Sequence, residues 1–237
     1  MKGVLVRVGI DQAYGEWNAP VDPETGDFVY VPIPDPDGSQ RHGLETPYSE
    51  VVPALRRFPG LELPPALKRR VMHLDPDFKH LTYGDNGVRR GRGLTDLGRG
   101  DVVAFYAGLR PVRSSPERLL YALIGLYSVQ ESVRLTSVPR DRWMENAHTR
   151  RKDHEGTDVI VRGNRSGSGR LRRCIAIGEW RDRAYRVRQD LLEEWGGLSC
   201  RDGYIQRSAV PPTFLQPERF VRWFERQKPE LIAANNP

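Results

Sequence analysis

Two apolar runs in the middle of the chain constrain the fold more than any other feature. They cover Val102–Ala107 and Tyr121–Val129, and a polar stretch that contains a proline separates them. Short apolar runs that are rich in valine and aromatic residues are typical of buried strands. Both are far shorter than the roughly 20 apolar residues that a membrane span needs. We therefore predict an antiparallel pair of strands at the centre of the fold, in a cytoplasmic protein with no membrane partner.

The other expected elements are short and surround this pair. The chain has 237 residues with 23 glycines and 19 prolines, which favours many turns over a helical bundle. Gly196 and Pro217 stand where one helix should end and another should begin. We predict strands at Lys2–Ile10, Phe28–Ile33, Leu171–Ile177 and Ala184–Val187, and helices at Gln189–Trp195 and Pro217–Lys228. No repeat or linker interrupts the pattern, so we expect a single α+β domain over residues 1–228 and a flexible C-terminal tail over residues 229–237.

The sequence contains none of the strong catalytic or cofactor motifs. There is no P-loop, no dinucleotide fingerprint, no nucleophile-elbow serine and no cysteine cluster with zinc spacing. The two cysteines, Cys174 and Cys200, are far apart in the sequence and are expected to be reduced thiols. We therefore expect neither a cofactor nor a bound metal.

Positive charge is concentrated in one segment. Residues 140–188 contain fourteen Lys or Arg and seven Asp or Glu residues, whereas the net charge of the whole chain is only +6. Nearly all of these cations are arginines, whose planar fork grips phosphates and guanine edges. Local clustering of this kind favours a polyanionic partner, so we expect the chain to bind nucleic acid or a nucleotide. A merely solvated basic face is the simpler alternative.

A histidine and two carboxylates alternate in the segment His73-Leu-Asp75-Pro-Asp77. In an extended stretch their side chains would share one face, where they could handle a proton or a metal ion. The Asp-Pro step, however, is ordinary turn chemistry. On spacing, we favour a structural turn over a metal site.

The same cluster opens a stretch from Met72 to Asp101 that is dense in glycine and charge, and we predict a long loop there. Tyr83 and Asp85 flank a glycine, and three arginines follow at positions 89, 90 and 92. A tyrosine in such a setting could stack on a base while Arg89, Arg90 and Arg92 hold its phosphate. A turn with an exposed aromatic side chain explains the pattern equally well.

Two further polar loops complete the set of candidates. Asn146 and His148 could read a base edge, with Arg150 and Arg151 anchoring the backbone, although a surface turn alone explains this segment. The N-terminal loop that runs from Asp11 to Asn18 contains two aromatic residues. Three such loops in one chain indicate a binding site more strongly than any one of them.

The order of these blocks resembles the third family of nucleotide modification associated domains. The blocks are RVGID, WNAPVDPETGDFVYVPIP, HLDPDF, LTYGD, GDVVAFYAGL, YALIGLYSV and ENAHTRR. The resemblance covers nearly the whole chain, from Val4 to about Phe224. Domains of this family are grouped by their association with systems that modify DNA bases. The resemblance therefore implies a biological context, but not a particular reaction.

A second likeness concerns the segment from Gly100 to Tyr106 and the strand that follows it. This pair is similar to the strand pair of the PUA-like group, which includes the EVE and ASCH domains. That likeness implies a PUA-like mixed or antiparallel β-barrel, or a strongly bent sheet, with flanking helices and with Tyr106 at the rim of a pocket. A structure without a closed or half-closed barrel around Phe105 and Leu123 would exclude it.

We accordingly expect a protein of a base-modification system that recognises, or helps to produce, a modified nucleotide. The residues expected around its pocket are Asp11, Asn18, His73, Asp75, Tyr83, Asp85, Asn146 and His148. The first alternative is an enzyme that uses His73 or His148 as general base with Asp75 or Asp85 as its partner. The second is a scaffold that docks other modification enzymes. An enzyme requires a histidine and a carboxylate in contact inside a pocket. A reader, which only recognises the modified base, requires an aromatic wall in the pocket, and a scaffold requires an exposed apolar patch. The sequence does not decide among them.

Overall fold

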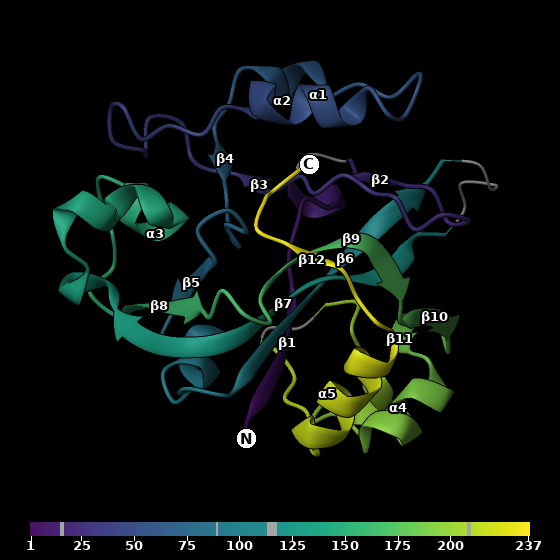
Figure 1. Ribbon diagram of the computed structural model, residues 1–237. Helices are drawn as coiled ribbons and strands as arrows, with labels where there is room; N and C mark the ends of the chain where they lie inside the picture. The colour runs from purple at the N-terminus through teal and green to yellow at the C-terminus, as the bar shows by residue number, and fades with distance from the viewer. Residues whose placement is uncertain (15–16, 89, 113–117, 208–209) are drawn as a thin grey trace.

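The fold is a mixed α+β arrangement in which helices flank a mostly antiparallel sheet (Figure 1). A computed structural model provides the structure and describes residues 1–14, 17–88, 90–112, 118–207 and 210–237. Within these residues no helix is long and apolar enough to cross a membrane.

The two central apolar runs form the predicted antiparallel pair. Strand β6 (Val102–Pro111) pairs with β7 (Leu120–Arg134) from Val102 opposite Ser128 to Leu109 opposite Leu120. On its other edge, β7 pairs first with β9 (Gly169–Ala176) and then with β8 (Asp158–Gly163). The long strand β7 thus connects two parts of the sheet.

The edges of the sheet are β1 (Gly3–Arg7), which is parallel to β6, and β5 (Thr82–Asn86), which is antiparallel to β8. Two short strands extend this sheet: β2 (Pro20–Val21) pairs with β6, and β12 (Leu231–Ile232) pairs with β9. Two separate two-stranded sheets are formed by β3 (Ile33–Pro34) with β4 (Met72–His73) and by β10 (Gly178–Arg181) with β11 (Ala184–Val187). The segment around Tyr83 is therefore a strand, whereas the sequence predicted a loop.

The sheet is strongly curved. The ring of Tyr83 in β5 lies 5.3 Å from the ring of Phe105 in β6, measured between centroids, although β7 and β8 lie between these strands. Curvature brings the two edges toward each other, but among the described strands no hydrogen-bonded pairing joins β1 to β5. The sheet is open there, so the PUA-like barrel stays a prediction.

Among the described residues, the two larger hydrophobic cores lie on opposite faces of the sheet. Phe105 points into the core that α1 (Val52–Leu55) and α2 (Pro65–Lys68) cover, whereas Tyr106 points into the one that α4 (Gln189–Trp195) and α5 (Pro217–Arg226) cover. Figure 1 shows these helix pairs at opposite ends of the molecule. Tyr106 is fully buried and donates a hydrogen bond to the carbonyl of Ile205 at 2.8 Å. The prediction that Tyr106 rims a pocket is therefore wrong, because alternation along β6 turns it into a core.

The predicted C-terminal helices are confirmed. Helix α4 ends at Gly196, whose φ of 79° is the left-handed conformation that glycine adopts readily. Helix α5 has Pro217 in its first turn and buries Phe220 and Phe224. One more short helix, α3 (Ala147–Arg150), lies beside β5, far from α4 and α5 in Figure 1, and carries His148.

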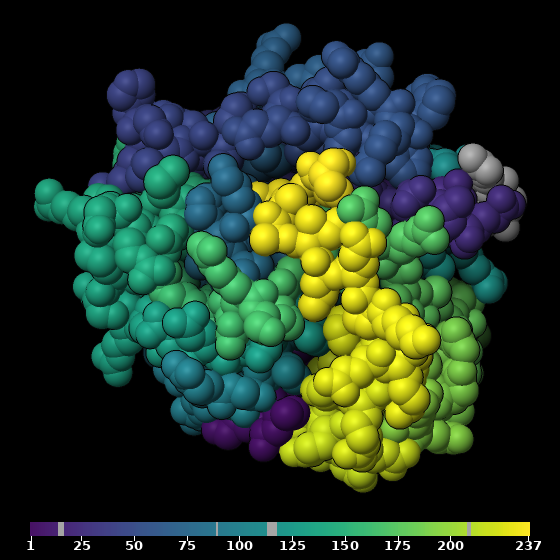
Figure 2. Space-filling model, viewed as in Figure 1, coloured from purple at the N-terminus to yellow at the C-terminus, as the bar shows by residue number. Residues whose placement is uncertain are grey.

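The segment that we expected to be a flexible tail makes specific contacts with the rest of the domain. Strand β12 pairs with β9, and the side chain of Asn235 accepts a hydrogen bond from the backbone N–H of Phe78 at 2.7 Å. Asn236 exchanges two hydrogen bonds with the backbone of Tyr30, at 2.7 and 2.8 Å. Figure 2 shows this segment running over the surface from α5 toward the N-terminal third of the chain.

Candidate functional site

A cavity of about 770 Å³ opens between the ends of β1 and β5. His73, Asp75, Tyr83, Asp85 and His148 line it, together with backbone of the segment after β1. The curvature of the sheet creates this space, since it places both edge strands around one hollow. The segments bearing the predicted polar residues thus meet at one place.

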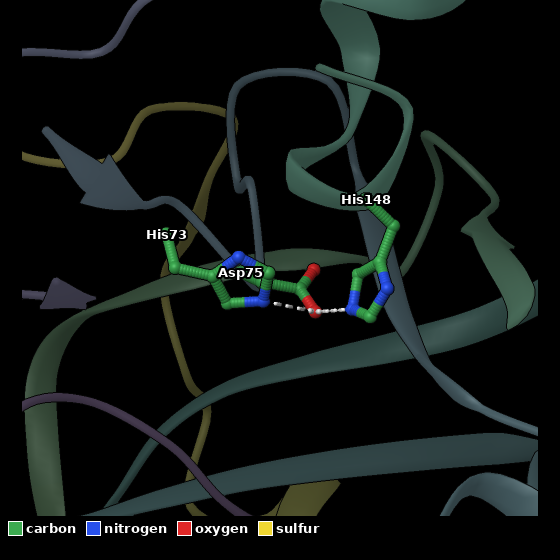
Figure 3. A group of neighbouring side chains, drawn as sticks. All are labelled: His73, Asp75 and His148. Atoms are coloured by element: carbon green, nitrogen blue, oxygen red, sulfur yellow. Dashed lines mark ion pairs between the residues drawn. The ribbon is translucent and has the colours of Figure 1, made fainter. Parts of the chain in front are cut away.

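Three buried side chains converge in the cavity (Figure 3). His73 projects from β4 and His148 from α3, and both imidazoles point at the carboxylate of Asp75. Nε2 of His148 lies 3.6 Å and Nε2 of His73 4.0 Å from Oδ2 of Asp75. Both distances exceed that of a hydrogen bond, so the two Nε2 atoms face the same oxygen without binding it.

Each histidine is held from behind by a second carboxylate. Nδ1 of His148 lies 2.8 Å from Asp158, which begins β8, and Nδ1 of His73 lies 3.1 Å from Asp35. Nη2 of Arg151 also approaches Nδ1 of His73 at 3.2 Å and donates to Asp35 as well. Nδ1 of His148 thus faces Asp158, and Nδ1 of His73 faces Asp35 and Arg151, so that in both rings Nε2 is the atom turned toward Asp75.

Asp75 is fixed by neutral donors. The backbone N–H of Gly84 donates to both carboxylate oxygens at 3.0 Å, and Nδ2 of Asn146 donates to Oδ1 at 3.1 Å. The other side of the same amide, Oδ1 of Asn146, accepts the backbone N–H of His148 at 2.8 Å and caps α3. Asn146 thus ties the carboxylate and one histidine together and does not itself line the cavity.

Gly84 is required by this arrangement for reasons of space. A Cβ atom at this position would lie 2.6 Å from Cδ2 of His148 and 3.0 Å from Oδ1 of Asn146. Only a residue without a side chain allows β5 to pass so close to the imidazole. The glycine of the Tyr83-Gly-Asp85 block is explained by this close approach and not by a turn.

The environment shifts the pKa values of the two histidines in opposite directions. Burial lowers the pKa of His73, and the nearby His148 adds to this effect, although the contact with Asp35 opposes it. Burial also disfavours the charged form of His148, but the carboxylates of Asp158 and Asp75 outweigh it and raise the pKa to about 9. The two imidazoles therefore differ in charge at neutral pH. Burial alone would raise the pKa of Asp35, but its contacts with His73, Gln40 and Arg151 outweigh burial and hold this pKa well below its usual range.

Arginines surround the mouth of the cavity. Arg7 forms an ion pair with Asp11 at 3.0 Å, and Arg90 lies 3.4 Å from Asp85 and donates to the carbonyl of Arg7 at 2.8 Å. Arg207 is exposed and lines the same cavity, and within the described part of the chain it has no ion-pair partner. These cations can meet an anionic ligand above the histidines.

Comparison with protein families agrees with this picture. The family model of nucleotide modification associated domain 3 matches residues 2–195. The chain belongs to this family. No curated protein and no solved structure matches the chain. The matched span contains all residues of the histidine–carboxylate cluster, and of the residues at the mouth only Arg207 lies beyond it. The predicted resemblance is thereby confirmed, and the domain is associated with a nucleotide-modification system.

The nucleotide modification associated domain uses some predicted residues differently from the expectation. Arg150, which we expected to hold a phosphate, is only 3% exposed and forms a buried ion pair with Asp77 at 2.5 Å. Arg151 pairs with Asp35 behind His73. Arg150 is therefore not available to an external phosphate, whereas Arg151 keeps 28% of its side chain exposed.

The other predicted ligand-binding residues are spread more widely. Asn18 is buried and donates to the carbonyl of Gly108 at 2.9 Å, so its amide serves the backbone. Arg92 is exposed on the 3₁₀ turn η3 (Arg90–Leu94) and does not line the cavity. Arg89 lies outside the described residues. Asp11, Asp85 and Tyr83 do line the cavity, in agreement with the prediction.

The basic segment of the domain is not a uniform positive surface. Many of its arginines pair with carboxylates, as in Arg162–Glu131, Arg172–Glu230, Arg181–Asp202 and Arg188–Asp190. Charge counted along the sequence therefore overstated what is free to meet a polyanion. The sequence also missed Asp35, Asp158, Arg7 and Arg207, which occupy ordinary local patterns.

The His73–Asp75–His148 cluster offers one ligand atom from each residue, and all three atoms lie within 4.8 Å of one another. We had favoured a turn over a metal site for the segment that contains His73 and Asp75. In the fold this segment continues from β4 into the cavity, and His148 supplies a third donor that lies far away in the sequence. The cluster has the donor types of a metal centre as well as those of an acid–base site.

Proposed function

We propose that this nucleotide modification associated domain is an enzyme, and that it acts on a nucleotide bound in the cavity. The observation that carries the proposal is the convergence of two buried histidines on one carboxylate oxygen, each held by a second carboxylate. A buried and pre-oriented polar cluster of this kind costs desolvation energy, and such costs concentrate at functional sites. The family supplies the substrate class, since its domains belong to nucleotide-modification systems.

The mouth of the cavity supports a nucleotide substrate. A phosphate near Arg207 would receive charge-assisted hydrogen bonds from a guanidinium that has no other ion-pair partner among the described residues. Arg7 and Arg90 can add to this contact, although each also holds a carboxylate. The base or sugar would then face the histidine–carboxylate cluster below.

A second hollow, of about 250 Å³, adjoins the first and shares Arg7 and Arg207 with it. Trp180 and Tyr185 line this hollow, and the indole of Trp180 is 39% exposed. Tyr185 packs edge-on against the indole at 4.9 Å, and the guanidinium of Arg118 lies 5.7 Å from its centroid. An exposed indole beside a guanidinium can stack on a base. We therefore propose that the substrate is a nucleotide within a strand, with a neighbouring base on Trp180.

The enzyme explains the cavity better than the two alternatives do. A reader of modified bases needs an aromatic wall at the bottom of the pocket, but Tyr83 is buried there and its ring packs edge-on against Phe105. A scaffold predicts an apolar docking patch in place of a polar cavity. The cluster of titratable groups is what the enzyme hypothesis requires.

The test uses three strains of the organism that carries the gene: wild type, a deletion, and a strain with Asp75→Asn. DNA from each is digested to nucleosides and analysed by mass spectrometry. We expect a modified nucleoside that is absent from both mutant strains. If the deletion removes it and Asp75→Asn retains it, the domain is a scaffold. If the deletion retains it, the domain is a reader. The amount of soluble protein shows whether the Asp75→Asn chain folds. A second substitution in the same cluster, His148→Gln, repeats the test.

Binding of the phosphate is tested separately in solution. We expect Arg207→Ala to weaken the binding of deoxynucleoside 5′-monophosphates about 10- to 100-fold, the usual worth of a hydrogen bond to a charged group. Arg92→Ala is the matched control, because Arg92 is exposed nearby but does not line the cavity. Equal affinities of the two variants would exclude a phosphate at the mouth.

A further inference from the structure

We infer that the floor of the cavity is a metal centre, in which Nε2 of His73, Oδ2 of Asp75 and Nε2 of His148 hold one divalent first-row transition-metal ion. The inference rests on the proposed function, since it names the cofactor of that same site.

The three donor atoms surround a common point. They lie within 4.8 Å of one another, with 3.6 and 4.0 Å between the imidazole nitrogens and Oδ2 of Asp75. Donors at about 2.1 Å from one ion lie roughly 3.0 to 3.4 Å apart in octahedral or tetrahedral geometry. Side-chain rotations that move each atom by less than about 1 Å produce that spacing. Such movements are within the range of ordinary rotamer adjustment.

The groups behind the histidines have the arrangement that metal ligands need. A histidine that binds a metal usually donates its other ring N–H to a carboxylate or carbonyl, which fixes the tautomer and the ring. Asp158 does this for His148 and Asp35 for His73, at 2.8 and 3.1 Å. Packing alone does not require two histidines that each have a carboxylate behind Nδ1 and that both turn toward a third carboxylate.

The two Nε2 atoms lack other partners. Among the described residues, neither His73 nor His148 has a hydrogen bond at Nε2, while both Nδ1 atoms are bound. Asp75 keeps Oδ2 directed at both rings because Gly84 and Asn146 hold the carboxylate from the other side. A cation between the three atoms would complete the coordination of all of them.

The local charge also favours a divalent cation. Asp35 is neutralised by Arg151. Asp75 and Asp158 pair with no Lys or Arg among the described residues, and only the histidines approach them. Two buried carboxylates without a fixed positive partner are costly, and one divalent ion balances them.

Two imidazoles and one carboxylate bind first-row metals such as Fe(II), Mn(II) and Zn(II), and leave further coordination positions open. Here the open positions face the cavity, where the substrate is proposed to bind. A metal ion bound in this way supplies a Lewis acid for a water molecule or a substrate oxygen. Asp158 and Asp35 are then positioning residues for the ligands.

The experiment begins with the full-length protein, stripped of metal by a chelator and titrated with Co(II). Co(II) bound by nitrogen and oxygen ligands gives visible absorption bands, so binding is read without any activity. We expect one ion per chain, confirmed by elemental analysis after loading with Zn(II), Mn(II) or Fe(II). Comparison of these ions identifies the preferred metal.

Variants assign the ligands. We expect His73→Gln and His148→Gln each to weaken Co(II) binding at least 100-fold, and Asp158→Asn to weaken it about 10- to 100-fold through the orientation of His148. His154→Gln is the matched control, because His154 is exposed and lies outside the cluster. Circular dichroism of the metal-free proteins shows whether each variant is folded.

Two results would overturn the inference: binding by the wild-type protein weaker than about 1 mM, or unchanged binding by a folded double variant without both histidines. Neither result touches the proposed function. Binding of deoxynucleoside monophosphates by the metal-free protein, and its loss in Arg207→Ala, is measured independently. The failure of one claim is therefore distinguishable from the failure of the other.

Discussion

Replacing Gly84 by alanine tests the geometry of the site with the smallest possible change. The new Cβ would lie 2.6 Å from Cδ2 of His148 and 3.0 Å from Cδ1 of Ile160. Carbon atoms in contact are normally about 3.5 to 4.0 Å apart, so the imidazole must move by roughly 1 Å. Overpacking of this size typically costs about 1–3 kcal/mol of folding stability. A displacement of about 1 Å in a reacting group can also cost roughly 100-fold in rate.

The matched control is Gly93→Ala. Nothing lies within 4 Å of a Cβ atom built on Gly93, and the same side chain is introduced. Urea denaturation of both variants should show a loss of about 1–3 kcal/mol for Gly84→Ala and less than about 0.5 kcal/mol for Gly93→Ala. Gly84→Ala should also lose the modified nucleoside in the cellular assay, whereas Gly93→Ala should keep it. If the two variants are equally stable and active, His148 does not lie against β5 as described.

Three further predictions concern the framework around the site. Arg150→Met removes the guanidinium from buried Asp77 and leaves His80, at 2.9 Å, as its remaining ionisable partner, which should cost about 3–5 kcal/mol in urea denaturation. A change below about 1 kcal/mol would show that the Arg150–Asp77 pair is not buried. Burial raises the pKa of Cys174 to about 12 and that of Cys200 to a lesser degree. Because the thiolate is the reactive form, maleimide should label Cys200 before Cys174 at neutral pH, as measured by mass spectrometry of peptides, and the reverse order would contradict this. Asn235→Ala removes hydrogen bonds to the loop before β5 and should lower the free energy of unfolding by about 1–3 kcal/mol, whereas unchanged stability would indicate a loose C-terminal segment.

Much of the fold follows from local patterns. The pair β6 and β7, strands β9 and β11, and helices α4 and α5 have apolar periodicity and end signals within a few residues, and all were predicted. Strand β5 was missed because glycine, aspartate and asparagine at positions 84–86 have the composition of a turn. Gly84 serves a contact with His148 instead, which no local pattern contains.

The site was predictable only in part. The sequence identified His73, Asp75 and His148 separately, because histidines near carboxylates are chemically informative wherever they occur. Their convergence depends on the curvature of the sheet and could not be read from spacing. Asp35 and Asp158 carry no signal at all, since a single aspartate at the edge of a strand is ordinary.

The charge pattern led us to overestimate the free positive surface for a related reason. Counting residues shows that arginines gather in residues 140–188, but not that Asp35, Asp77 and Glu131 from elsewhere in the chain meet them. Ion pairing depends on the fold, whereas composition gives only the net charge of a segment. The arginine that is best placed for a phosphate, Arg207, lies outside that segment.

A crystal structure of the protein with a deoxynucleoside 5′-monophosphate would show directly whether the cavity binds a nucleotide. We expect the phosphate within hydrogen-bond distance of Arg207, and the nucleoside directed at Asp75 and His148. A nucleotide found only on exposed arginines such as Arg173, with the cavity empty at saturating ligand concentration, would refute the proposed site.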